Sequence, residues 1–186
     1  EIRGHYEELS GVEETAAEVF YESKKVAATV AMLSEMQMLA ARLYRIAQQQ
    51  RASLDFTLPT LLRALQEVVS CLQVYRTYVP PRGWEAGEED HRRIGLAVRL
   101  AKRRNPSMSR SLFDFIASVL LLQFPATLDH EQREAWRHFA LKLQQVSGPI
   151  AAKGVEDTAF YRYYPLASLN EVGGELDAGG LSADEF

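Results

Sequence analysis

The sequence is poor in the features that mark several protein classes. It has one cysteine, so a disulfide framework and a cysteine-based metal cluster are excluded. No uninterrupted apolar run approaches the roughly 20 residues of a membrane-spanning helix, and the first residues lack a signal-peptide pattern. The net charge of −4 gives no general attraction to nucleic acid or anionic lipid. We therefore expect a cytoplasmic protein with no nucleic-acid or membrane partner and with Cys71 as an inert, buried thiol.

The composition is that of a folded globular chain. Hydrophobic residues make up 47% of the 186 residues and charged residues 25%, which excludes wholesale disorder. The length suits one or at most two ordinary domains. Because the chain begins at Glu1 rather than at methionine, we expect a fragment or a processed product.

Residues 13–50 contain neither proline nor glycine, which predicts a long helix. An unbroken helix of this length would span about 50 Å, so we expect a break near Ser23–Lys24. One face carries large apolar residues at helical spacing: Met32, Met36, Leu39, Leu43 and Ile46. We interpret this stripe as core filling, with a ligand groove as the alternative.

Further helices are bounded by capping and breaking residues. Thr57 and Pro59 are typical of a helix start, and Val74–Val79 reads as an extended stretch that stops at a proline pair. A helix over 88–104 has acids at its start and a Lys-Arg-Arg end, a polarity that complements the helix dipole; a phosphate-binding patch at the basic end is the alternative.

Two more helices complete the expected architecture. Residues 111–123 are apolar nearly all round, which predicts a central helix, and the last long helix begins near Asp129. We expect Ser147–Pro149 to interrupt that helix in its final turn. The chain is thus predicted to be all-α, an irregular helical bundle of about five helices.

Two patterns resemble sites and have simpler explanations. His130, Glu134 and His138 share one helical face that could hold zinc or iron, but charged neighbours favour a solvated surface, and we predict no metal and no cofactor. The pairs Gly173–Gly174 and Gly179–Gly180 follow no strand and precede no phosphate-binding lysine, which indicates connectors.

The segment from Lys153 to Glu171 differs from the rest. Its periodicity stops, and four of the five residues over 160–164 are aromatic, interleaved with charged and amide side chains. Aromatic faces with nearby hydrogen-bonding groups are what sugar recognition requires. Glu156 and Asp157 could serve as paired carboxylates for acid/base work. The alternative is a capped turn whose tyrosines pack on the bundle.

Residues 144–174, named here the signature segment, resemble the signature of maltooligosyltrehalose synthases, a family in the α-amylase superfamily. The stretch reads QQVSGPIAAKGVEDTAFYRY and continues to SLNEVGG at 168–174. Weaker matches are DFTL at 55–58, VYRTYV at 74–79, RRNP at 103–106 and FDF at 113–115.

The resemblance implies an enzyme that rearranges the reducing end of a maltooligosaccharide into a trehalose unit by intramolecular glycosyl transfer, without a cofactor. It also implies a (β/α)₈ barrel with added helical domains, whose strands carry the catalytic carboxylates. None of those carboxylates falls in this chain, which we expect to be the helical insertion domain of the larger barrel enzyme and inactive by itself. The alternatives are a non-catalytic helical module that shapes the sugar site of an amylase-like hydrolase, and a purely structural bundle.

The resemblance also supplies the candidate sugar-site residues. They are Lys153, Glu156, Asp157, Phe160, Tyr161 and Tyr163. We expect Lys153 to hydrogen-bond sugar hydroxyls, and Phe160 and one tyrosine to stack on a glucose ring. Glu156 and Asp157 either touch sugar or brace Lys153.

The same resemblance gives a division of the chain. Arg162, Asn170 and Glu171 are expected to hold the loop around the site. The predicted parts are a helical domain over 1–147, a site-forming segment over 148–174 that leads back to the barrel, and a connector over 175–186.

Overall fold

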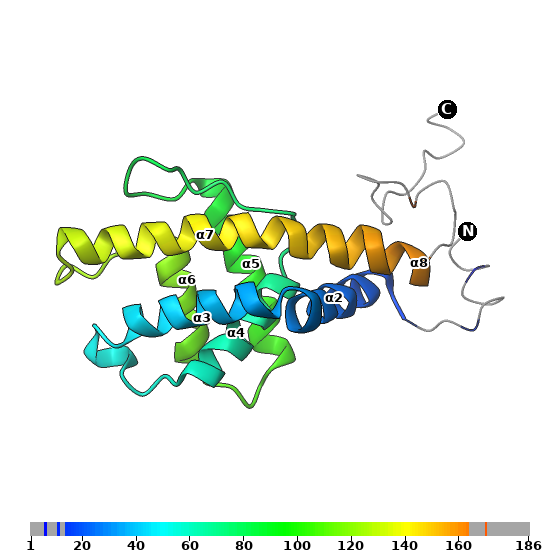
Figure 1. Cartoon of the computed structure of the whole chain (residues 1–186), viewed down its shortest axis with the longest axis horizontal. Coiled ribbons are helices and arrows are strands. Elements are labelled where there is room, and N and C mark those ends of the chain that lie inside the picture. The colour runs from blue at the N-terminus through cyan, green and yellow to red at the C-terminus, as the bar shows by residue number, and fades with distance from the viewer. Residues whose placement is uncertain (1–5, 7–10, 12–13, 164–169, 171–186) are drawn as a thin grey trace.

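The computed structural model describes residues 6, 11, 14–163 and 170. The regular secondary structure of these residues is entirely helical. The helices are α2 (Ala16–Val26), α3 (Leu33–Ala47), α4 (Leu58–Ser70), α5 (Glu88–Arg104), α6 (Arg110–Leu120), α7 (His130–Gly154) and the short α8 (Phe160–Arg162). Figure 1 shows α7 lying along the whole length of the molecule with the other helices packed beneath it. The all-α prediction is confirmed. Within the described ranges, no helix combines the length and the apolar character that crossing a membrane needs.

The predicted helix over 13–50 is divided into α2 and α3, but not at the expected place. Helical geometry continues through Ser23–Lys24, passes through a π-helical turn, η1 (Ala27–Ala31), and breaks at Met32, whose φ of −116° and ψ of 27° leave the helical region. The predicted position was therefore wrong by about two turns, and the break adds one helix to the expected five. Lys24 is buried beside α7, so packing keeps that part of α2 helical.

Side-chain caps fix the starts of two helices where the sequence predicts them. The hydroxyl of Thr57 accepts a hydrogen bond from the backbone of Thr60 at the start of α4, and Pro59 lies in the first turn. The carboxylate of Asp129 accepts from the backbone of Gln132 at the start of α7. In each case the backbone N–H of the cap residue also donates to the side chain of the third helical residue, so two hydrogen bonds hold each helix start.

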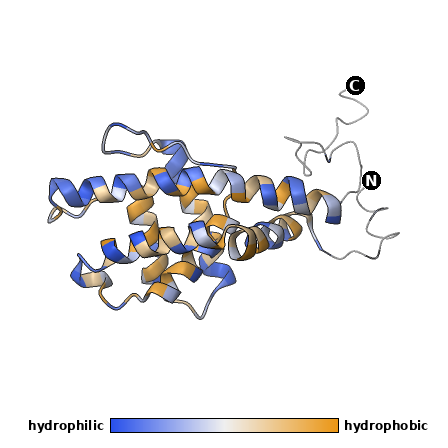
Figure 2. Ribbon diagram, in the orientation of Figure 1, coloured by the Kyte–Doolittle hydropathy of each residue, from blue (hydrophilic) through white to orange (hydrophobic). Residues whose placement is uncertain are grey.

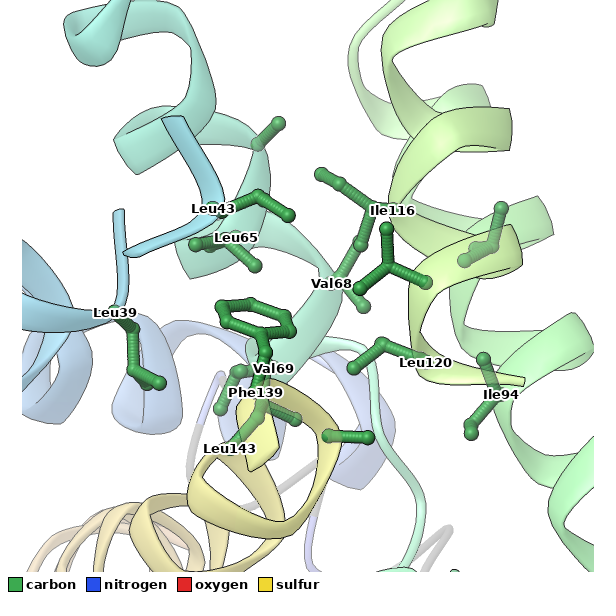
Figure 3. Close-up of a cluster of buried hydrophobic side chains, with 14 of the residues drawn as sticks. Leu39, Leu43, Leu65, Val68, Val69, Ile94, Ile116, Leu120, Phe139 and Leu143 are labelled. Atoms are coloured by element: carbon green, nitrogen blue, oxygen red, sulfur yellow. The ribbon is translucent and has the colours of Figure 1, made fainter. Parts of the chain in front are cut away.

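The main core lies between α3, α4, α6 and α7 (Figure 3). The apolar stripe of α3 is its first wall, with Met36, Leu39 and Leu43 at 0% exposure, which confirms core filling over a ligand groove. Phe113 and Ile116 of α6 are equally buried, as expected for a central helix. Figure 2 shows the hydrophobic residues gathered where the helices face one another and hydrophilic residues along the outer side of α7.

Helix α7 runs through the position at which an interruption was expected. It continues past Pro149 to Gly154, then passes through the π-helical turn η3 (Val155–Ala159) into α8. A proline removes one helical hydrogen bond and costs roughly 3 kcal/mol in a helix interior. Ile150 and Ala151, which follow it directly, are buried, and their packing holds the helix together across Pro149. The interruption predicted at Ser147–Pro149 was wrong, and the boundary at 147/148 crosses a continuous helix.

The segment between α4 and α5 has no regular structure, as predicted for Val74–Val79, and it is anchored at two points. Gln144 of α7 donates to the carbonyl of Val79 at 3.3 Å and accepts from the hydroxyl of Thr77 at 3.4 Å. The backbone N–H of Tyr78 donates to the buried carboxylate of Asp90 at 2.8 Å, in the first turn of α5. This extended segment is therefore a fixed wall of the molecule.

The two ends of the described chain meet at one end of the molecule, where Figure 1 shows α2 and α8 together. A small apolar cluster joins them, with Ala16 and Val19 from α2 against Phe160 and Tyr163. The rings of Tyr6 and Tyr163 lie edge to face with centroids 5.3 Å apart. The chain therefore enters and leaves the helical body side by side.

Candidate functional site

A groove of about 910 Å³ opens beside the extended segment. Its walls come from α2, from residues 70–78, from both ends of α5 and from the junction of α7 with η3. The lining is rich in hydrogen-bonding groups, which include Lys24, Tyr75, Arg76, Asp90 and Arg104. Pockets of 300–1,000 Å³ are typical of small-molecule sites, so the groove has the size of a binding site.

The signature segment forms part of the groove wall through Ala151 and Val155, and a short hydrogen bond joins it to the opposite wall. The hydroxyl of Tyr75 donates to the carboxylate of Glu156 at 2.6 Å. Burial first, and then this hydrogen bond to a carboxylate, raises the pKa of Tyr75 to about 12. The structure thus joins two stretches that the sequence analysis singled out separately, VYRTYV at 74–79 and the signature segment.

Three of the six candidate residues form an exposed row that runs from the end of α7 through η3 to α8. Lys153, Asp157 and Tyr161 follow one another at intervals of four residues, which places them on one side of a helix. The ammonium of Lys153 lies 3.3 Å from the carboxylate of Asp157, and Tyr161 is 79% exposed. We call these three residues the exposed row. It offers a cation, an anion and an aromatic face to whatever lies against this end of the molecule.

Of the two acidic residues that could brace Lys153, Glu156 and Asp157, only one contacts it within the described chain. Asp157 contacts Lys153, whereas Glu156 is bound to Tyr75. The two carboxylates therefore have separate partners, and the helical geometry of η3 turns adjacent residues in different directions. This arrangement is not that of a carboxylate pair sharing one reacting group.

Phe160 and Tyr163 point into the molecule. Phe160 is 7% exposed and Tyr163 is 0% exposed, and both pack in the small cluster with Val19 of α2. The capped-turn alternative therefore describes Tyr163 correctly but fails for Tyr161, which is mostly exposed. Among the described aromatic residues of the signature segment, Phe160, Tyr161 and Tyr163, it is Tyr161 that is exposed.

The predicted holding residues do hold the end of α8. Arg162 forms an ion pair with Glu14 at 3.4 Å. The side-chain amide of Asn170 donates to the carbonyls of Phe160 and Tyr163 at 2.7 Å and 2.9 Å, which satisfies carbonyls left free where the helix ends. Glu171 lies outside the described residues, as do the two glycine pairs.

Gly154, within the signature segment, makes the closest backbone contact of α7 with α2. A Cβ atom at Gly154 would lie 2.6 Å from the Cα and from the Cγ of Lys24, and 2.8 Å from its backbone nitrogen. Real Cβ atoms do not approach so closely, so this crossing requires glycine. The side chain of Lys24 reaches from this crossing to the groove wall, where its ammonium donates to the carbonyl of Leu72.

Lys24 is a buried cation without a carboxylate partner among the described residues. Burial disfavours its charged form and lowers its pKa to about 8. Cys71 lies nearby, and burial raises the pKa of its thiol to about 11, which confirms the buried thiol expected from the sequence. Perturbed groups that line a pocket are candidates for function.

Beside Lys24, a satisfied ionic network links α2, α4 and α5. Buried Glu67 accepts a hydrogen bond from Tyr21 at 2.7 Å and pairs with Lys25 at 3.1 Å. The guanidinium of Arg104 binds Glu18 and lies 3.7 Å from the centre of the Tyr21 ring. Burial raises the pKa of Glu67, but hydrogen bonds from Tyr21, Asn105 and Lys25 outweigh it and lower the net value.

The other predicted surface patterns have ordinary partners. Glu134 pairs with Arg137 at 2.5 Å and with His138 at 3.7 Å, while the ring of His130 packs on Trp84. Among the described residues, no group of three histidine, cysteine or carboxylate side chains could hold a metal ion.

The basic end of α5 is likewise engaged by neighbouring side chains. Lys102 pairs with Asp114, and Arg104 pairs with Glu18. Two of the three cations that suggested a phosphate-binding patch are therefore neutralised within the molecule.

Sequence reasoning missed Lys24, Gly154 and the Glu67 network. Lys24 lies within a long amphipathic stretch, where a lysine is normally solvated, and only its position relative to the apolar stripe could have indicated burial. Gly154 is a glycine inside a helix, which costs about 1 kcal/mol against alanine and is therefore a sign of close packing. That signal was available and was not used.

Sequence similarity to known proteins is found over a short stretch of the chain. No protein-family model and no solved structure matches it. Two curated proteins of Mycobacterium tuberculosis, from strain CDC 1551 / Oshkosh and strain ATCC 25618 / H37Rv, are each named "Putative maltooligosyl trehalose synthase" and are 55% identical to the chain over 47 residues. The matched stretch is 25% of this chain and 6% of each relative, so the chain corresponds to a small part of their length. The similarity supports the resemblance in part.

Proposed function

We propose that this chain is a helical domain of a maltooligosyltrehalose synthase, an intramolecular transferase that converts the reducing end of a maltooligosaccharide into a trehalose unit. The observation that carries the proposal is the 55% identity over 47 residues with proteins of that name. The synthase chemistry needs carboxylates on a barrel, which the rest of the parent protein would supply.

The arrangement of the chain ends supports an insertion into a larger protein. Glu14 and Arg162 are ion-paired, and Tyr6 packs on Tyr163, so the entry and exit of the described chain are adjacent. Inserted domains have closely spaced ends, because the host must close around the insertion without distortion. The described residues of the signature segment from Phe160 to Tyr163 lie at that same end, which we propose faces the host.

The exposed row is the part of this domain that we propose to contact sugar. Tyr161 offers a flat ring for stacking on a glucose face, and Lys153 with Asp157 offers hydrogen bonds to hydroxyl groups. Phe160 and Tyr163 support the row from inside by fixing α8 against α2. Of the six candidate residues, we thus propose that the three of the exposed row contact sugar and that Phe160 and Tyr163 support them. The sixth, Glu156, is hydrogen-bonded to Tyr75.

The experiment is to incubate the intact parent protein with maltopentaose and to follow reducing ends and free glucose together. Loss of reducing ends with little free glucose is the expected result. A rise in reducing ends would instead favour the alternative of a helical module in an amylase-like hydrolase, and no change in either would refute both enzymes.

Variants of the exposed row test the role of this domain. Replacement of Lys153 by alanine is expected to lower kcat/KM roughly 10- to 100-fold, the effect of losing a charged hydrogen bond to substrate. Lys142→Ala, on the same helix but bound to Gln145, is the matched control and should keep full activity. Equal activities of the two variants would remove the exposed row from the sugar site.

A further inference from the structure

The groove contains a cluster of hydrogen-bond donors that the proposed sugar contacts do not use. Lys24 is 8% exposed and lines the groove, and its one hydrogen bond is to the carbonyl of Leu72. An ammonium group has three donors. A charge buried without an opposite charge is unfavourable, so an anion in the groove would stabilise Lys24.

The backbone beside Lys24 adds further donors. Within the described part of the chain, the N–H groups of residues 73–77 have no hydrogen-bond acceptor in the protein. The next N–H, that of Tyr78, is taken by Asp90. These free donors belong to residues that line the groove. Residues 73–75 form a bend, and successive backbone N–H groups in a turn conformation can hold an anion.

The charges of the groove wall also favour an anion. Arg76 lines the groove and stacks at 4.8 Å on the ring of Tyr78, without a carboxylate partner among the described residues. The two acidic lining residues are both engaged, Glu89 with Arg92 and Arg93, and Asp90 with the backbone of Tyr78. Because Glu89 pairs with Arg93 and Arg104 pairs with Glu18, the charges left in the groove wall are two positive ones, Lys24 and Arg76, and one negative one, Asp90. The groove therefore keeps a net positive charge in a chain whose net charge is −4.

We propose that the groove binds a phosphate monoester, with the phosphate held by the ammonium of Lys24, the guanidinium of Arg76 and the free N–H groups of residues 73–77. A tetrahedral dianion can accept from all three kinds of donor at once, whereas a carboxylate has two oxygens in one plane. The volume of about 910 Å³ leaves room for an organic part of sugar size beside Tyr75. This inference does not depend on the proposed enzyme activity.

The test is calorimetric titration of the intact protein at constant ionic strength with four probes: inorganic phosphate, glucose 6-phosphate, glucose and acetate. The expected result is binding of both phosphates, tighter for the ester, with no measurable binding of glucose or acetate in this groove. Equal binding of glucose and glucose 6-phosphate would overturn the proposal and indicate a neutral sugar groove. Equal binding of acetate would reduce the site to general charge attraction and overturn it as well.

Variants locate the site. Lys24→Met removes the charge and keeps most of the apolar stem. Arg76→Gln changes an arginine whose contact within the described chain is with the ring of Tyr78. Each is expected to weaken phosphate binding about tenfold or more. Lys102→Met, a cation that pairs with Asp114 on the surface of α5, is the control and should bind as the unmodified protein does. Unchanged affinity in both Lys24→Met and Arg76→Gln, with folding verified by circular dichroism, would refute the assignment.

Discussion

The crossing of α2 and α7 at Gly154 gives a prediction that can be worked out from the structure. Replacing Gly154 by alanine adds one methyl group where the Cα of Lys24 lies 2.6 Å away and its backbone nitrogen 2.8 Å away. Backbone atoms cannot rotate aside, so the two helices must move apart. Overpacking of this kind costs about 1–3 kcal/mol.

A second effect of the substitution acts in the opposite direction. Alanine is about 1 kcal/mol more favourable than glycine in a helix interior. The net expectation for Gly154→Ala is therefore a loss of up to about 2 kcal/mol, which for a chain of this size lowers Tm by up to about 8 °C.

Gly95 provides the matched control. It lies inside α5, and a Cβ there would meet the guanidinium end of Arg99 at 3.4 Å, a flexible group that can move. Gly95→Ala should therefore show the helix gain without the clash and raise Tm by about 2–4 °C. Thermal unfolding followed by circular dichroism compares the two variants directly.

The contact at Lys24 can be tested further by a double variant. Lys24→Ala removes the Cγ half of the contact but leaves the backbone half, so it should recover part of the loss in Gly154→Ala. If Gly154→Ala matched Gly95→Ala in stability, the close crossing of α2 and α7 would be refuted.

Three further substitutions test buried and partly buried polar groups. Glu67→Gln should lower the free energy of unfolding in urea by about 2–4 kcal/mol, because it breaks a buried ion pair. The control Glu89→Gln, at an exposed ion pair, should lower it by less than about 1 kcal/mol. Similar losses in the two variants would contradict the buried network. Because the folded-state pKa of Lys24 is lowered to about 8, the penalty on its charged form is full below about pH 8 and is relieved as the pH rises. The stability of the unmodified protein should therefore rise by about 1 kcal/mol from about pH 7 to about pH 9 relative to that of Lys24→Met, and parallel pH profiles would show that the lysine is not buried in its charged form. Tyr75→Phe should lower stability by no more than about 1 kcal/mol yet reduce the activity of the parent enzyme, and an unchanged kcat/KM would show that the bond to Glu156 is structural.

Much of the fold could be predicted from local signals. Thr57 and Asp129 start helices because their side chains cap free N–H groups, a preference that depends on a few neighbouring residues. The apolar stripe from Met36 to Ile46 became a core wall because helical spacing alone places its members on one face. Both rules act over a few turns, and both were confirmed.

The two errors in the helix boundaries have one physical origin. Gly148–Pro149 is a strong local breaking signal, yet Ile150 and Phe160 are buried on either side of η3 and keep the chain helical. The stretch around Lys24 carries no breaking residue, and the bend at Met32 is set by packing. Tertiary contacts decided both places, and a local pattern cannot reveal them.

The candidate site was predictable as a segment but not as an arrangement. The aromatic and charged composition after Lys153 singles out the right stretch, but composition does not tell which aromatic points outward. Tyr161 lies in α8 and is 79% exposed, whereas Tyr163, two residues later and just beyond the helix end, is 0% exposed. The groove was missed because its walls come from four parts of the chain that are distant in sequence.

The side-by-side meeting of the chain ends has a mechanical consequence. A force that separates residue 14 from residue 163 acts first on the ion pair between Glu14 and Arg162. It acts next on the small cluster of Val19, Phe160 and Tyr163, so these contacts break one after another. The main core between α3, α4, α6 and α7 lies beyond that cluster and carries no load until it has opened. Strain in a host protein would therefore loosen α8 and the exposed row while the helical body stays folded.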